Sequence, residues 1–497
     1  MEGVVLRSTR GFSSDTKYIA LSHCWGNTKP RCMTTSKNYD RQCQKIPWAD
    51  IPKTFREAMQ YTQRLGVRYI WIDSVCIIQP GDDQYYDDWL VEAVRMSDYY
   101  YNAYVTLAAA SSADCHGGLF SKQPDRKHCL FRATIGGKHC QFFAARTSED
   151  VHYRNAYAEI QAHRWPLGTR GWVYQERLVS CRVLYFTTYQ LIFDCFRGLA
   201  SEEWSCYSHP EPEMSLKRLY WELLHDTTAL LAWQKLIEDY SALRLTNLGD
   251  RLPAMAAIAQ QVLSRQGPGG TLGSTYLCGL RASSLHSGLL WLVGDHEPQL
   301  RQDSRCLAPS WSWASYPKKV RHHWNSGEES YKSQIELVGD SLEFTASGRF
   351  GSCTGGYITI RAPVIDCVWE VGLDSHGSLD ATDLLLDPDP SSPERRIIRF
   401  PPDYPAGFQE LEGLKHLDEV KVKVIQVCSD PLGVLFLYQS PKTKLYRRLG
   451  AVVYSDGQIS KLAPAGPGFP GVTVSGIKAV VSAPDFSKAG CQTLKLG

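Results

Sequence analysis

The sequence of 497 residues lacks the long apolar segments that insert into membranes. No window approaches the roughly eighteen consecutive apolar residues of a membrane-spanning helix. The first fifteen residues, MEGVVLRSTRGFSSD, also lack the apolar core of a secretory signal. These absences predict a cytoplasmic protein that does not bind membranes.

Strong charge of one sign is lacking as well. Lys and Arg number 54 against 52 Asp and Glu, and the formal net charge is only +2. Basic residues never form a run of five or more. Binding to nucleic acid or to a lipid surface through charge alone is therefore not expected.

The 16 cysteines include no C-x-x-C pair, which argues against a zinc ribbon or a thioredoxin-like motif. Without a secretory signal we expect reduced thiols. The tripeptide Lys-His-Cys occurs twice, at 127–129 and 138–140, and two His-Cys pairs have the ligands that zinc prefers. A hairpin with incidental thiols, turning at Gly136-Gly137, is the favoured interpretation, so no metal is expected.

The first third of the chain alternates strand and helix patterns. YIALS at 18–22 is a short apolar strand, and a helical pattern opens at Pro52 and stops at Gly66. A strand at 69–73, a helix at 84–103 and a strand at 104–110 follow. This order predicts a parallel sheet with right-handed crossovers, an α/β fold.

Later segments predict a different organisation. The first half of 170–195 has a helical pattern and its second half one or two strands, 214–265 is helical, and strands dominate from about 330. The length itself predicts about two to four domains. We expect an α/β domain, a mostly helical extension and a β-rich C-terminal region, with bounds at 1–205, 206–325 and 326–497.

The apolar run YIWIDSVCIIQ at 69–79 places one acid, Asp73, inside an otherwise apolar segment. A run without alternation is typical of a strand covered on both faces. Ser22 ends the first strand and His23 and Cys24 follow it, so they would meet Asp73 and Ser74 at the carboxyl edge of one sheet. Nucleophilic or acid–base chemistry is one interpretation. The alternative is a buried structural thiol, a loop histidine and an Asp that caps a turn.

Two further polar groups stand out. Glu92 lies beside the apolar stripe of the helix at 84–103, where a carboxyl can have a raised pKa and act on a substrate. Trp172, Gln175 and Glu176 share one face of a predicted helix that begins near Arg170. A solvated helix face and an internal ion pair are the respective structural alternatives.

Three blocks of this sequence resemble a known family. They are YIALSHCWG at 18–26, the long segment at 51–120 that contains YIWIDSVCIIQ, and TRGWVYQERLVSCRVLYFTTYQLIFDC at 169–195. In length, order and spacing they are similar to the heterokaryon incompatibility (HET) domain proteins of filamentous fungi. The downstream segments DRLPA at 250–254 and PSWSWAS at 309–315 also resemble that family.

The resemblance implies a role in fungal non-self recognition and programmed cell death. HET domains have been likened to TIR domains, which are flavodoxin-like α/β units, and many TIR domains cleave NAD with a helix-borne glutamate. By this analogy NAD is a substrate and not a cofactor, Glu92 is the catalytic carboxylate, and Ser22, His23 and Asp73 line the nucleotide crevice. The chain has no P-loop and no repeat array, so it resembles a stand-alone HET protein.

Two other functions remain open at this stage. An enzyme of fungal secondary metabolism would use His23, Asp73 and Glu92 for acid–base work on a small organic substrate, with Cys24 as nucleophile. A non-catalytic interaction module would bind a protein partner or a second copy of the chain. For either enzyme, the residues expected to bind the small-molecule ligand are Ser22, Trp25, Ser74, Arg170, Trp172, Gln175 and Glu176.

Overall fold

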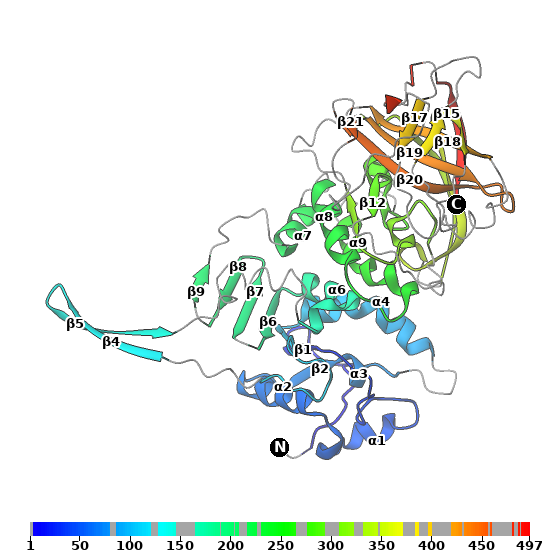
Figure 1. The fold of residues 1–497 in the computed structure, drawn as a ribbon. Helices are drawn as coiled ribbons and strands as arrows, with labels where there is room; N and C mark the ends of the chain where they lie inside the picture. The colour runs from blue at the N-terminus through cyan, green and yellow to red at the C-terminus, as the bar shows by residue number, and fades with distance from the viewer. Residues whose placement is uncertain are drawn as a thin grey trace, which may run out of the picture. The chain divides into compact units, whose positions relative to one another are not determined.

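The computed structural model divides the chain into two compact units, Met1–Trp221 and Glu222–Gly497 (Figure 1). It describes residues 3–79, 86–120, 128–145, 165–188, 190–202, 204–207, 216–225, 230–264, 276–293, 308–322, 332–345, 348–370, 383–386, 396–399, 419–429, 432–455, 458–459, 480–481, 486–487 and 489–497. The three-part division near 205 and 325 stays a prediction from sequence.

A seven-stranded sheet in the order β2-β1-β3-β6-β7-β8-β9 forms the centre of the first unit as described. Its first four strands along this order are parallel, and the remaining three are antiparallel. The predicted α/β fold with neighbouring parallel strands is confirmed, and the sheet as a whole is mixed. The strands are β1 (Tyr18–Ser22), β2 (Tyr69–Ile72), β3 (Val105–Ala108), β6 (Arg182–Phe186), β7 (Leu191–Cys195), β8 (Gly198–Ser201) and β9 (Trp204–Tyr207).

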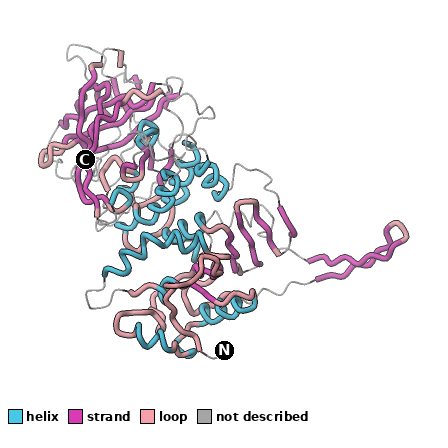
Figure 2. The backbone as a smooth tube through the Cα atoms, turned by 180° about the vertical axis from the view of Figure 1, so that it is seen from behind, coloured by secondary structure: helices cyan, strands magenta, loops and turns pink. Residues whose placement is uncertain are grey.

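Helices lie on both sides of this sheet (Figures 1 and 2). Successive side chains of β1 point to opposite faces of the sheet. Ile19 and Leu21 pack with Phe55 of α2 in one buried cluster. Ala20 and Ser22 therefore face the other side. That other side carries α4 and α6, which contact each other. The helices of this unit include α1 (Tyr39–Gln44), α2 (Lys53–Arg64), α3 (Asp73–Cys76), α4 (Tyr86–Asn102) and α6 (Gly171–Val179).

The prediction for the apolar run at 69–79 needs a correction. β2 ends at Ile72 and lies at the edge of the sheet, and three of its four residues are only half-buried. Asp73 opens the short helix α3, where an acid interacts favourably with the free N–H groups of the first turn. The run is apolar because it supplies a strand and then a buried helical turn, not one strand covered on both faces.

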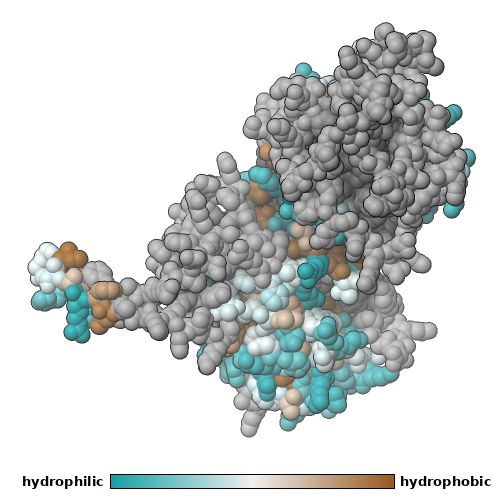
Figure 3. Space-filling view, in the orientation of Figure 1, coloured by the Kyte–Doolittle hydropathy of each residue, from teal (hydrophilic) through white to brown (hydrophobic). Residues whose placement is uncertain are grey.

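The predicted hairpin is present. β4 (His128–Ile135) and β5 (Lys138–Ala145) are joined by Gly136 and Gly137, both with positive φ. The register pairs His128 with Ala145 and His139 with Thr134, so the two His-Cys pairs lie at opposite ends of the hairpin. In the parts of the chain that the structure describes, no group of three or more metal-ligating side chains occurs. Figure 3 shows hydrophobic and hydrophilic side chains on this hairpin, and a mostly hydrophilic surface around α1 and α2.

The second unit combines helices with a mostly antiparallel sheet, so the predicted β-rich C-terminal region is confirmed. Its described helices are α8 (Leu230–Ser241), α9 (Pro253–Ser264) and α10 (Leu285–Gly288), while α7 (Leu216–His225) spans the boundary between the units. The short strands form two pairs, β10 (Tyr276–Leu277) with β11 (Leu280–Arg281) and β12 (Trp291–Val293) with β13 (Val320–His322). The large sheet contains β14 (Glu336–Phe344), β15 (Cys353–Glu370), β16 (Asp383–Leu386), β17 (Arg396–Arg399), β18 (Glu419–Ser429), β19 (Leu432–Gln439), β20 (Tyr446–Ser455), β21 (Gln458–Ile459), β22 (Val480–Val481) and β23 (Cys491–Leu496).

Tryptophans hold the core of the second unit. Trp291, Trp311 and Trp313 are fully buried, and each indole N–H donates to a backbone carbonyl at 3.0–3.1 Å. Buried indoles with a satisfied N–H combine a large apolar contact with a fixed orientation. The segment at 309–315 therefore has a structural role. Among the described helices of the whole chain, none is long and apolar enough to cross a bilayer.

Candidate functional site

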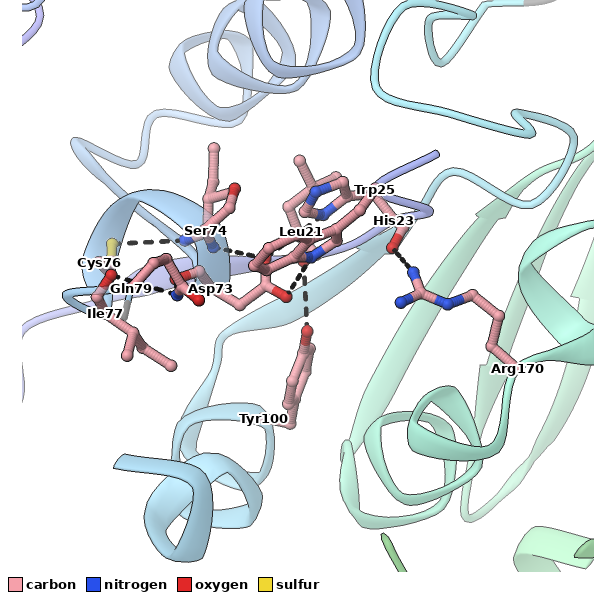
Figure 4. Close-up of polar contacts among 11 residues, drawn as sticks. Leu21, His23, Trp25, Asp73, Ser74, Cys76, Ile77, Gln79, Tyr100 and Arg170 are labelled. Carbon is pink, nitrogen blue, oxygen red and sulfur yellow. Dashed lines mark hydrogen bonds and ion pairs between the residues drawn. The ribbon is translucent and has the colours of Figure 1, made fainter. Parts of the chain in front are cut away.

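The polar residues that follow β1 and β2 come together at the carboxyl edge of the sheet (Figure 4). Because β1 and β2 are parallel neighbours with Leu21 opposite Ile72, the loop after Ser22 and the start of α3 leave the sheet side by side. Figure 4 shows Asp73 beside Trp25, with Tyr100 of α4 and Arg170, the residue before α6, approaching from the other side. This is the convergence that the strand order predicted.

Gly26 allows the loop after β1 to turn. Its φ is +74°, and a Cβ there would lie 2.4 Å from the Cβ of Asp114. Asp114 is fixed in turn, because its Oδ1 accepts the N–H groups of His116 at 2.7 Å and Gly117 at 3.0 Å. Only glycine combines the left-handed backbone with this close approach. The glycine thereby directs His23 and Trp25 toward Asp73.

The Asp73 carboxylate lies at the centre of the polar cluster. The other members of this cluster are Ser22, His23, Trp25, Ser74, Tyr100, Arg170 and Glu176. The Oδ2 of Asp73 accepts the indole N–H of Trp25 at 2.7 Å, and its Oδ1 accepts the N–H of Ser74 at 2.6 Å. Oδ1 also lies 3.7 Å from Nδ1 of His23. The Asp73 side chain is 19 % exposed, so it connects the buried members of the cluster with solvent.

His23 is a neutral imidazole in a closed environment. Its side chain is 1 % exposed, and its ring meets the Phe55 ring edge-on with 4.7 Å between centroids. Burial lowers the pKa of His23 below 6.5, and the Arg170 charge acts in the same direction against the pull of Asp73. Arg170, which precedes α6, donates from its guanidinium to the His23 carbonyl at 2.8 Å.

Glu176 on α6 is the most perturbed acid of the cluster. Burial raises the pKa of its carboxyl from 4.5 to about 7, and the Asp73 carboxylate adds to the rise. The hydroxyls of Ser22 and Tyr100 and the Arg170 guanidinium oppose it. Near neutral pH this carboxyl is therefore able to gain and lose a proton, which is the property of a general acid or base.

Several buried polar atoms of the cluster make no hydrogen bond of good geometry with the described residues, although the Ser22 hydroxyl is close enough to Glu176 to affect its pKa. They are Ser22 Oγ, both ring nitrogens of His23, Ser74 Oγ and Glu176 Oε2. In folded proteins buried polar groups are nearly always hydrogen-bonded, so an unpartnered group calls for an explanation. Five such buried donors and acceptors lie around Asp73, as is typical of sites that hold ordered water or another small polar group.

Cys24 lies beside the cluster but belongs to the apolar core. It is buried with Ala108, Trp165 and Val173 in a hydrophobic cluster. Burial raises the pKa of its thiol. A nucleophilic cysteine needs the opposite shift, so this environment favours the structural interpretation of the thiol.

Glu92 makes its described contacts within its own helix. It is 3.5 Å from Arg95 and accepts a hydrogen bond from the Tyr99 hydroxyl. Glu92 is not among the groups that shift the pKa of His23 or Glu176. The structure therefore brings His23, Asp73 and Glu176 together and leaves Glu92 apart from them.

The remaining predicted site residues differ in how far they are buried. Ser22, Ser74 and Gln175 are buried, whereas Trp25 and Trp172 are half-buried. Two contributions were missed from sequence. One is Tyr100, which donates to the Leu21 carbonyl at 3.3 Å and lies near Glu176. It stands in a run of three tyrosines, and nothing in the sequence distinguishes it from its two neighbours. The other is the role of Glu176, which was expected only to bind substrate. Helical spacing does not reveal that this carboxyl is completely buried, so its raised pKa could not be predicted.

The fold and this edge define an α/β domain with a polar cluster at the carboxyl ends of parallel strands. Residues 18–176 match the family model described as Heterokaryon incompatibility protein (HET). The chain therefore contains a HET domain, and this segment includes every residue of the cluster. Searches of curated proteins and of solved structures found no match.

Proposed function

We propose that this HET-domain protein hydrolyses the N-glycosidic bond of NAD at the polar cluster. The observation that carries the proposal is the pair of neighbouring carboxyl groups, Asp73 and Glu176, of which the buried one has its pKa raised to about 7. Enzymes that cleave glycosidic bonds use two carboxyl groups in different environments to divide charge stabilisation and proton transfer.

The sheet supports a nucleotide substrate. The strand order β2-β1-β3 is the one that begins flavodoxin-like folds, with which TIR domains are classed. In such sheets ligands bind outside the carboxyl ends of the strands, where β1 and β3 lead in opposite directions. The polar cluster lies at the carboxyl ends of β1 and β2, beside that point.

The proposed reaction uses the two carboxyl groups in different roles. The Asp73 carboxylate stabilises the positive charge that develops on the ribose as the C1′–N1 bond breaks, and the bonding electrons neutralise the pyridinium ring of nicotinamide. Glu176, in its ionised form, accepts a proton from the water that attacks C1′. The products are nicotinamide and ADP-ribose. Nicotinamide leaves as a neutral molecule, so no acid is required to protonate it.

The other members of the cluster orient the substrate. The buried His23 ring supports the loop from within, since its Nδ1 lies 3.7 Å from Oδ1 of Asp73, and the Ser22 and Ser74 hydroxyls are buried at the same edge. Trp25, fixed by its hydrogen bond to Asp73, presents an aromatic ring for stacking. Loss of cellular NAD would connect this activity with the cell death expected of HET proteins.

Incubation of the purified protein with NAD tests the proposal. We expect release of nicotinamide, lowered by about a hundredfold or more in Glu176→Gln and in Asp73→Asn. Glu92→Gln is the matched control, since it neutralises the other candidate acid, and it should stay within a few-fold of wild type. Absence of nicotinamide at micromolar enzyme would overturn the activity. Loss of activity only in Glu92→Gln would overturn the assignment of the site.

A further inference from the structure

The amino-terminal edge of the same parallel sheet carries a row of cations and tyrosines. Lys17, Arg68, Arg182 and Tyr104 are exposed there, and Tyr18 and Tyr69 are half-buried. We call these six residues the cation–tyrosine row. They lie at the opposite ends of the strands from the polar cluster, so the proposed hydrolysis makes no use of them.

The strand register makes the row continuous. Tyr18 of β1 is paired with Tyr69 of β2, and the N–H of Tyr104 donates to the Tyr18 carbonyl at 2.8 Å. Arg182, at the start of β6, donates from Nε to the Tyr104 carbonyl at 2.7 Å. Neighbouring strands are about 4.8 Å apart, so four adjacent strands span roughly 15 Å.

The cations rest on aromatic rings. The Lys17 ammonium and the Arg182 guanidinium lie 5.1 Å and 5.2 Å from the centre of the Tyr104 ring. Arg68 lies 5.7 Å from the centre of the Tyr69 ring. Within the described residues, none of these three cations has a carboxylate at ion-pair distance. The rings hold their positive charge in place, and the only carboxylate recorded near the row among the described residues is Asp98, whose charge acts on Tyr18.

We infer that the cation–tyrosine row is a docking surface for an acidic, extended peptide segment of a partner protein. Three cations spaced along one edge complement a chain with several Asp or Glu side chains. Arg68 and Arg182 each present a planar fork that matches a carboxylate, and the tyrosine rings offer contact area at low entropic cost. Such a partner would bind while the opposite edge of the sheet remains open to substrate.

Fluorescence polarisation of the full-length protein with a labelled oligo-glutamate peptide tests this inference. We expect binding that weakens as salt is added, because the attraction is electrostatic. Lys17→Gln/Arg68→Gln should lower the affinity by about tenfold or more, and Arg182→Gln should also lower it. The control is Arg41→Gln/Lys45→Gln, which removes two exposed cations in and beside α1 without changing the row.

The double variant at Lys17 and Arg68 alters only exposed side chains, so it keeps the test informative if Arg182→Gln fails to fold. Circular dichroism melting verifies the fold of each variant. Absence of peptide binding at low salt would overturn the inference, and so would equal affinity in the row variant and the control. Tighter row-dependent binding of single-stranded oligothymidylate would overturn it in favour of nucleic acid.

Discussion

At the scale of single residues, Glu176 combines two opposing requirements. Burial favours its protonated form, whereas the proposed reaction uses its ionised form. In the unfolded chain the carboxyl titrates near 4.5, and in the folded protein near 7. Folding therefore binds a proton in this range, and the stability that the protonated carboxyl contributes is lost as the pH rises through about 7. A shift of this size corresponds to about 3 kcal/mol.

This linkage predicts that Glu176→Gln is more stable than wild type in alkaline solution. The variant keeps a neutral side chain of similar shape, so the free energy of unfolding should exceed that of wild type by up to about 3 kcal/mol at pH 8. At pH 4 the two proteins should be nearly equally stable. Urea unfolding at both pH values measures the difference, with Glu92→Gln as the control. The same difference at both pH values would contradict the assigned burial of the charge.

At the scale of elements, the loop after β1 depends on Gly26. Alanine at this position would combine an unfavourable φ of +74° with a contact of 2.4 Å to Asp114. Gly66 at the end of α2 is the matched control, with φ of +71° and no atom within 4 Å of the position that a Cβ would take. It is the glycine that ends a helix in the left-handed conformation.

We therefore expect Gly66→Ala to cost about 1 kcal/mol and Gly26→Ala roughly 3 kcal/mol of stability. Gly26→Ala should also lower NAD hydrolysis beyond its effect on the folded fraction, because the loop holds His23 and Trp25 in place. Thermal unfolding and initial rates provide the two measurements. Equal losses of stability in both variants would show that the approach to Asp114 does not matter.

The elements show how far the sequence determines structure and site. Period and helix-end signals located β1, α2, β2, α4 and β3, and they placed Ser22, His23 and Asp73 at one edge. These signals are local, so they could not show that β2 is an edge strand. β2 is an edge strand because it pairs only with β1, and strand pairing is a property of the tertiary structure. They also could not rank Glu92 against Glu176, because desolvation of a carboxyl results from tertiary packing.

At the scale of the whole molecule, the polar cluster lies entirely within the first unit. The HET match, the seven-stranded sheet and all contacts of Asp73 fall within Met1–Trp221. The start of α7 is fixed to this unit by Lys217, whose ammonium donates to the Ser180 carbonyl at 2.9 Å and lies 3.6 Å from Asp194. Charged groups buried this deeply need such partners.

A fragment of residues 1–225, which ends with α7, should therefore fold and hydrolyse NAD. Circular dichroism and cooperative thermal unfolding measure the fold, and nicotinamide release measures the activity. The same fragment with Glu176→Gln provides the inactive control. A soluble, folded fragment without activity would show that the second unit contributes to catalysis.

The hydrogen bond from Arg170 to the His23 carbonyl has a consequence for folding kinetics. The two residues are 147 positions apart in sequence, so their contact requires closure of a long loop. Contacts of such separation form late, because loop-closure entropy opposes them until the intervening elements are in place. During synthesis, the site cannot assemble before residue 176 has left the ribosome. Under the proposed function, NAD hydrolysis would therefore begin only after the whole domain has been synthesised.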